Sequence, residues 1–160
     1  MPVFTHLDGD KARMVDVSAK GEVYRRAIAS GSIHLRPDTV RAIREGTTVK
    51  GNVLATARVA ATLAVKDTPR IIPMCHTIPV HGIDISFSFT ENSIASQVTV
   101  VSAGKTGVEM EALVGVSTAL LTIWDMVKSA EKDKDGQYPV TGISDIRVIE
   151  KVKQEIPETG

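Results

Sequence analysis

The chain has one cysteine, few aromatic residues and no net charge, and each of these shortages excludes a class of protein. A single cysteine cannot build an intrachain disulfide framework, and it favours a reducing compartment. Aromatic residues make up 4% of the sequence, too few for a surface that stacks single-stranded bases. A formal net charge of +0 gives no general attraction to nucleic acid or to an anionic membrane. We therefore expect no nucleic acid and no membrane among the partners.

Long apolar segments are also missing. Residues 1–20 contain no apolar core of the signal-peptide kind, and no later apolar run is expected to span a membrane. Hydrophobic residues at 42% and charged residues at 24% are ordinary for a globular protein. The sequence thus predicts a cytoplasmic protein with one domain over residues 23–153, a mobile segment over 1–22 and a frayed tail over 154–160.

The order of predicted elements indicates an α+β fold. The spacing of apolar residues, glycines and prolines predicts strands at 31–37, 83–90, 94–103 and 144–152, and helices at 37–46, 51–67 and 107–132. The strands at 83–90 and 94–103 are close enough to form a hairpin. A hairpin between two strand–helix units is typical of a ferredoxin-like α/β sandwich with an antiparallel sheet, a fold that carries many unrelated functions. We expect one sheet face to lack a helix cover and to need a partner.

Residues 73–82, with the sequence PMCHTIPVHG, hold the only cysteine beside a histidine. Cys75 and His76 are adjacent, so on an extended chain they point to opposite sides, and no second pair completes a zinc site. Adjacency equally opposes a nucleophile–base pair, and nothing marks the cysteine as activated. Two interpretations stay open: a turn bounded by prolines, or a loop that binds a small molecule.

The GKTG stretch at residues 104–107 is not a phosphate-binding P-loop, because Thr99 stands where that motif needs a glycine. The free N–H groups of a helix start, together with Lys105, would still favour an anion. The stretch EKDKDG at residues 131–136 has Gly142 where a calcium loop needs an acidic residue, and it predicts a solvated turn instead.

The helix predicted at 107–132 carries few polar residues, and most of them share a narrow stripe: Glu111, Thr118, Thr122 and Asp125, with Lys128 at the edge. Glu109 lies toward the apolar face. The stripe is either the wet side of a buried helix or the lining of a cavity where acid, base and cation meet. Arg58 poses a similar choice as the sole charge between Asn52 and Val65, since it could pair with a buried acid or bind an anion.

Five stretches occur together in one order: MVDVSAK (14–20), KGNVLATARVAA (50–61), IIPMCHTIP (71–79), GKTGVEMEAL (104–113) and LTIWDMVKS (121–129). With these stretches the chain resembles the cyclic pyranopterin monophosphate synthase family, the molybdenum cofactor biosynthesis accessory protein C family, over about residues 10–152. The resemblance implies a lyase that converts 3',8-cyclo-7,8-dihydroguanosine 5'-triphosphate, a cyclised dihydro-GTP, into cyclic pyranopterin monophosphate and pyrophosphate. It implies no cofactor and no metal.

The resemblance also implies roles for individual residues. The implied catalytic residues are Asp125, Lys50 and Lys128. The implied substrate-binding residues are Met74, Cys75, His76, Met110 and Glu111, with Glu109, Arg58, Lys105, Lys20 and Asp16 as further pocket residues. On this basis residues 1–22 contribute to the site, residues 73–82 form a substrate loop, and His81 is a bystander. The family pattern further implies a homo-hexamer, a trimer of dimers whose sites are shared between subunits. The competing class is a ferredoxin-like module that carries a nucleotide without turnover.

Overall fold

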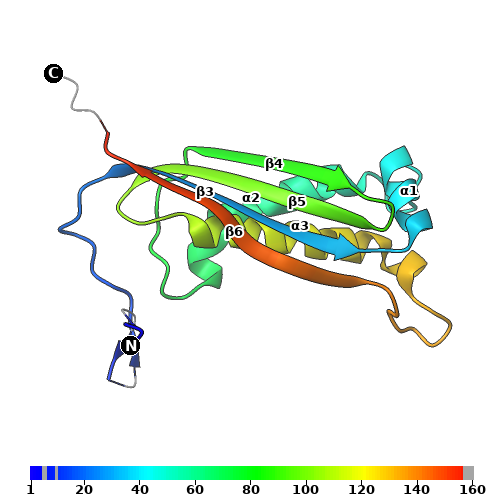
Figure 1. Cartoon of the computed structure of the whole chain (residues 1–160), viewed down its shortest axis with the longest axis horizontal. Helices are drawn as coiled ribbons and strands as arrows, with labels where there is room; N and C mark the ends of the chain where they lie inside the picture. Colours follow the sequence, from blue (N-terminus) through cyan, green and yellow to red (C-terminus); the bar gives the residue numbers. More distant parts are fainter. Residues whose placement is uncertain (5–6, 10, 157–160) are drawn as a thin grey trace.

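The computed structural model describes residues 1–4, 7–9 and 11–156, and its centre is a four-stranded antiparallel sheet. The strands are β3 (Val23–His34), β4 (Gly82–Phe89), β5 (Ser93–Gly104) and β6 (Gly142–Gln154), in the order β4-β5-β3-β6. The helices α2 (Val53–Ile71) and α3 (Glu109–Glu131) cover one face of this sheet, and α1 (Pro37–Glu45) lies at one end of the molecule (Figure 1). This arrangement confirms the predicted α+β, ferredoxin-like sandwich.

The N-terminal segment leaves the sheet and carries a small hairpin that the sequence did not predict. Its two short strands are β1 (Leu7–Asp8) and β2 (Lys11–Ala12), which pair with each other and with no strand of the main sheet. Figure 1 shows this hairpin away from the sandwich, below the end of the sheet where β3 starts.

Local capping signals explain where the first two helices begin and end. Pro37 opens α1, and Gly46 closes it in the left-handed conformation at φ 70°. The Asn52 side chain accepts a hydrogen bond from the N–H of Ala55 and so caps the start of α2. The helix α2 runs beyond the predicted residue 67 to Ile71, with Pro69 inside its last turn.

The first sheet strand is longer than predicted. The structure starts it at Val23, whereas the sequence indicated a strand only from Gly31. The buried positions in the early part of β3 hold Arg25, Ala27 and Ala29, so the alternation of large apolar residues that marks a strand is weak there.

The core between sheet and helices is built from aliphatic and small residues, and glycines allow the layers to approach closely. A Cβ on Gly31 would lie 2.9 Å from Val116 of α3, and a Cβ on Gly115 would lie 2.8 Å from Val65 of α2. By length and composition α3 could cross a membrane, contrary to our expectation, but a core helix meets the same test. In this fold α3 packs on the sheet and on α2, which accounts for its apolar sequence.

The face of the sheet opposite the helices differs from the expected apolar surface. It carries polar side chains such as Ser30, Ser32 and Gln97, with the half-buried Ile28 and Val101 among them. The exposed apolar side chains lie instead on the outer sides of α2 and α3 and on the edge strand β6, namely Val59, Leu63, Leu121, Ile146, Val148 and Ile149.

Candidate active site

A cavity of about 270 Å³ opens at the N-terminal end of α3, where three segments of the chain meet. These are the N-terminal segment, the loop after α2, and the turn that leads from β5 into α3. The lining residues are Val15, Val17, Lys20, Met74, Cys75, His76, Thr106, Gly107, Met110 and Glu111. The substrate residues implied by the sequence at positions 74–76 and 110–111, together with Lys20, therefore come together in this cavity.

Side-chain contacts attach the N-terminal segment to the rest of the cavity. The ring Nε2 of His76 contacts the Val15 carbonyl oxygen, and Lys105 Nζ donates to the Ser18 carbonyl at 3.4 Å. The Asp16 carboxylate accepts from the Ser18 N–H at 2.8 Å, and this bond, helped by the positive charges of His76 and Lys105, lowers the pKa of Asp16. The segment is thus held by residues that the sequence assigned to the pocket.

Burial changes the acidity of two groups in the cavity. The Glu111 side chain is 3% exposed, and its burial, followed by the charge of Glu109, raises the pKa of its carboxyl group. Burial and the charge of Glu111 likewise raise the pKa of the Cys75 thiol. A raised pKa means less thiolate, so the cavity does not activate Cys75 as a nucleophile. Glu111, in contrast, is suited to hold a proton nearer neutral pH.

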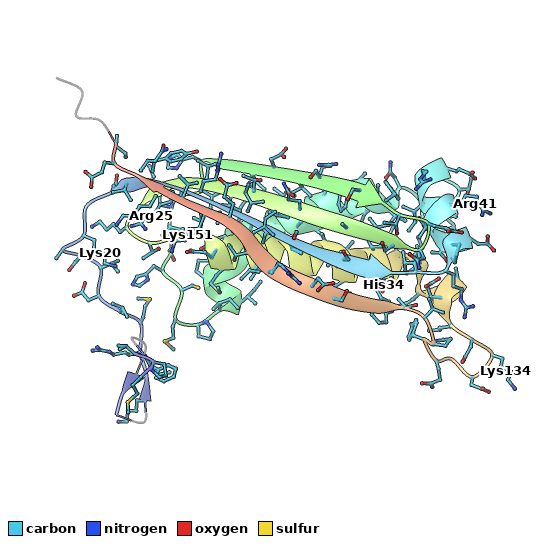
Figure 2. The ribbon with its side chains drawn as sticks, viewed as in Figure 1. Lys20, Arg25, His34, Arg41, Lys134 and Lys151 are labelled. Carbon is cyan, nitrogen blue, oxygen red and sulfur yellow. The ribbon has the colours of Figure 1, made fainter. Side chains whose placement is uncertain are left out.

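Two cations that sequence analysis did not assign lie beside this cavity. Arg25 of β3 donates to the carbonyl oxygens of Gly104 and Lys105, and Lys151 of β6 pairs with Glu109. Burial raises the pKa of Glu109, but its bond with Lys151 and the charge of Arg25 outweigh this and lower it. Figure 2 shows Lys20, Arg25 and Lys151 at the same end of the molecule. Only the register of β3 between β5 and β6 places these cations there, so no local motif could reveal them.

The predicted catalytic residues form a second cluster near the C-terminal end of α3. Lys128 Nζ lies 2.8 Å from Asp125 Oδ1, and Lys50 Nζ lies 3.6 Å from Asp125 Oδ2. The hydrogen bond from Lys128 lowers the pKa of Asp125, and the same bond raises the pKa of Lys128. These side chains are between 43% and 61% exposed. Asp125 and Lys128 line a hollow of about 320 Å³ with Leu121, Trp124 and Tyr138.

The cavity and the Asp125 cluster do not meet within one chain. Fourteen positions along α3 separate Glu111 from Asp125, which corresponds to about 21 Å at about 1.5 Å per residue. The stripe predicted on this helix changes character along that length, because Glu111 is buried, Thr118 and Thr122 are half-buried, and Asp125 is exposed. The cavity and the Asp125 cluster therefore lie toward opposite ends of α3 and share no lining residue.

Arg58 and His81 lie outside both regions. Arg58 donates to the Ile85 carbonyl and stacks over the Phe87 ring at 5.4 Å, in a groove that shares no lining residue with the cavity or the hollow. His81 directly precedes β4, where its Nδ1 accepts from the N–H of Ala103 at 3.1 Å.

Over residues 1–4, 7–9 and 11–156, no three His, Cys, Asp or Glu side chains group closely enough to hold a metal ion.

Comparison with known proteins identifies matches over nearly the whole chain. The model of the MoaC family matches residues 14–154. A protein of Methanospirillum hungatei JF-1, named probable cyclic pyranopterin monophosphate synthase, is 81% identical over 98% of this chain and 100% of its own length. Proteins with the same name from Methanosphaerula palustris and Thermococcus onnurineus are 71% and 57% identical, over 96% and 97% of this chain and 99% of their own lengths.

Proposed function

Because the chain belongs to the MoaC family, we propose that it is a cyclic pyranopterin monophosphate synthase, a lyase of molybdenum cofactor biosynthesis. Its substrate is 3',8-cyclo-7,8-dihydroguanosine 5'-triphosphate, and its products are cyclic pyranopterin monophosphate and pyrophosphate. The observation that carries this proposal is the match to a protein of that name at 81% identity over that protein's whole length. The single free cysteine, Cys75, agrees with a cytoplasmic location.

We assign a different part of the reaction to the cavity and to the hollow. At the cavity, the N-terminal end of α3 has no side-chain cap, so its N–H groups and the ammonium groups of Lys20 and Lys105 can bind the phosphates. Glu111 can hold or deliver a proton because its pKa is raised. At the hollow, we assign to Lys128 the proton that is taken up as the purine ring opens. The bond with Asp125 raises the pKa of Lys128, which makes it a weaker acid for as long as the pair is intact. Lys50 adds a second positive charge beside Asp125.

The separation of the two regions supports a site shared between subunits. Neither region holds the full set of implied residues, and the exposed apolar side chains on α2 and α3 include Val59, Leu63 and Leu121. A neighbouring copy that covers these side chains could bring its cavity to the Asp125 cluster. We therefore propose a homo-hexamer, a trimer of dimers, in which each site takes residues from two chains.

The activity is tested by incubating the protein with the cyclised precursor and detecting the pterin product together with pyrophosphate. Lys128→Ala should abolish product formation and leave the fold intact, since Lys128 is half-exposed and does not belong to the buried core. Lys134→Ala is the matched control, because Lys134 lies exposed on the loop after α3 (Figure 2). Near-normal turnover by Lys128→Ala would rule out the assigned site. Binding of the precursor without turnover by the wild type would instead identify a nucleotide carrier.

The shared site is tested by mixing subunits. Glu111→Gln and Lys128→Ala should each be inactive alone, and mixed assemblies should recover part of the activity because some of their sites hold neither substitution. An active species that light scattering places near 17.2 kDa would disprove the shared site.

A further inference from the structure

The loop between α3 and β6, residues 132–141, is ordered by its own hydrogen bonds although most of it is exposed. The Asp133 carboxylate accepts from the N–H groups of Asp135 and Gln137, both at 2.9 Å. The Asp133 N–H donates to the Gln137 carbonyl at 2.9 Å, and Gly136 takes a left-handed φ of 75° at the turn. These bonds fix the path of the loop immediately before Tyr138.

Both ends of this loop are fixed to one buried carboxylate. Glu131, the last residue of α3, is 0% exposed and accepts a 2.8 Å hydrogen bond from the Thr141 hydroxyl at the far end of the loop. It also accepts from the Thr39 hydroxyl and from the Arg36 N–H, which hold it against α1. The prediction of a solvated turn at residues 131–136 was therefore wrong for Glu131. The groups that donate hydrogen bonds to its carboxylate lie in other segments of the chain, so the local sequence did not indicate its burial.

The loop places the Tyr138 ring against the hollow that holds Asp125 and Lys128. The ring meets Trp124 edge to face, with centroids 5.2 Å apart and planes at 71°. Lys132 Nζ lies 6.0 Å from the centroid of the Tyr138 ring. Trp124 directly precedes Asp125 on α3, and Tyr138 forms one wall of the hollow. One aromatic pair thus joins the ordered loop to the catalytic end of the helix.

The Asp125–Lys128 pair needs such support, because its charges alone do not fix it. Both side chains are more than two-fifths exposed, so solvent screens the attraction between their charges and the ion pair holds its geometry only weakly. Catalysis is sensitive to position, since a misplacement of about 1 Å can cost about 100-fold in rate. A rigid wall beside the pair restricts both side chains without any further charge.

We propose that Tyr138 is a positioning residue, whose ring, held by the 132–141 loop, packs on Trp124 and keeps Asp125 and Lys128 aligned toward the substrate. This inference rests on the proposed function, in which Asp125 and Lys128 transfer protons. The ring makes the contact with Trp124, and we assign the positioning role to it rather than to the hydroxyl group.

The first experiment uses Trp124, the only tryptophan of the chain, as a fluorescent reporter in the full-length protein. Tyr138→Ala should shift its emission to longer wavelength and increase quenching by acrylamide, because one face of the indole becomes exposed. Tyr138→Phe should change neither. Val140→Ala, a substitution of another exposed residue in the same loop, is the matched control. An unchanged emission in Tyr138→Ala would overturn the packing role.

The second experiment measures kcat and KM for the same variants with the cyclised precursor. Tyr138→Ala should lower kcat by about 10- to 100-fold with little change in KM, and Tyr138→Phe should restore the wild-type kcat. An equal loss in Tyr138→Phe would assign the role to the hydroxyl and overturn the proposal. Loss of assembly mass in Tyr138→Ala would overturn it too, by making Tyr138 a subunit contact.

The two proposals fail in different ways. If Lys128→Ala abolishes turnover and Tyr138→Ala keeps its kcat, only the positioning role is wrong. If Lys128→Ala is active, the assigned catalytic site is wrong, and the fluorescence of Trp124 still reports whether Tyr138 packs on it. Tyr138→Leu serves as a second variant should Tyr138→Ala fail to fold.

Discussion

Replacing Glu131 by alanine is expected to destabilise the protein more than any surface substitution. The carboxylate is fully buried and accepts from three donors, which are the hydroxyls of Thr39 and Thr141 and the N–H of Arg36. Hydrogen bonds to a charged group contribute about 1.5–3 kcal/mol each, so the three would give about 4.5–9 kcal/mol as an upper bound. Removing the charge also removes its desolvation cost, and we expect a net loss of about 3–5 kcal/mol.

The assay is thermal and denaturant unfolding at fixed protein concentration, because assembly makes the midpoint depend on concentration. For a chain of 160 residues, about 1 kcal/mol shifts Tm by about 2–4 °C, so Glu131→Ala should lower Tm by roughly 6–20 °C. Thr39→Val removes one donor without a large cavity and should cost about 1–3 kcal/mol. In the double variant the two losses should not add, and the coupling should exceed about 0.5 kcal/mol.

Two results would refute this reasoning. A loss below about 1 kcal/mol in Glu131→Ala would mean that the carboxylate gains no more from its donors than its burial costs. Strict additivity of Glu131→Ala and Thr39→Val would mean that the two side chains act independently, against their hydrogen bond. Either result would also remove the anchor that we assign to the 132–141 loop.

Three further predictions concern the cavity, the core and the phosphate contacts. Glu111→Gln should abolish turnover yet raise the free energy of unfolding at neutral pH. Burial raises the pKa of Glu111 above its ordinary 4.5. The wild-type carboxyl group therefore stabilises the folded state fully below about pH 4.5, and this stabilisation is lost as pH rises through the raised pKa. Denaturant titrations should therefore show the advantage of the variant shrinking towards about pH 4, and an advantage independent of pH would contradict the shift. Gly115→Ala should cost about 1–3 kcal/mol in the same unfolding assay, because its Cβ would lie 2.8 Å from Val65, while Gly21→Ala meets no atom within 4 Å and should be neutral. Lys20→Ala and Lys105→Ala should each weaken binding of a stable GTP analogue by about one to two decades in calorimetric titration, whereas Arg58→Ala, outside the cavity, should not; unchanged affinity in both lysine variants would place the phosphates elsewhere.

Local signals in the sequence were enough to locate most elements. Pro37, Gly46 and Asn52 act through contacts within one helical turn, so the limits of α1 and the start of α2 could be predicted closely. The early half of β3 could not, because Arg25 stands at an inward position where its contacts come from the carbonyls of Gly104 and Lys105. A residue whose partner lies about 80 positions away leaves no local pattern.

The candidate site, like the fold, could be predicted from the sequence only in part. Residues 74–76 and 110–111 lie in compact stretches that the family resemblance implied as pocket residues, and they line one cavity in the structure. The link between Lys50 and Asp125 was implied only by family resemblance, since 75 positions separate them. Lys151 and Tyr138 were missed altogether, because strand register and loop packing place them beside the site.

The absence of buried aromatic rings has a consequence for how this protein can be observed. Its tryptophan, tyrosines and phenylalanines are all half-buried or exposed, and the apolar part of the interior consists of valine, isoleucine, leucine and alanine. Near-ultraviolet absorption and fluorescence therefore report only on the border of the interior, and the tryptophan emission comes from the last turns of α3. A fluorescence melt of this protein follows local opening of that end, and a backbone signal such as far-ultraviolet dichroism follows the sandwich. A gap between the two midpoints would thus measure how much more easily the catalytic end opens than the rest.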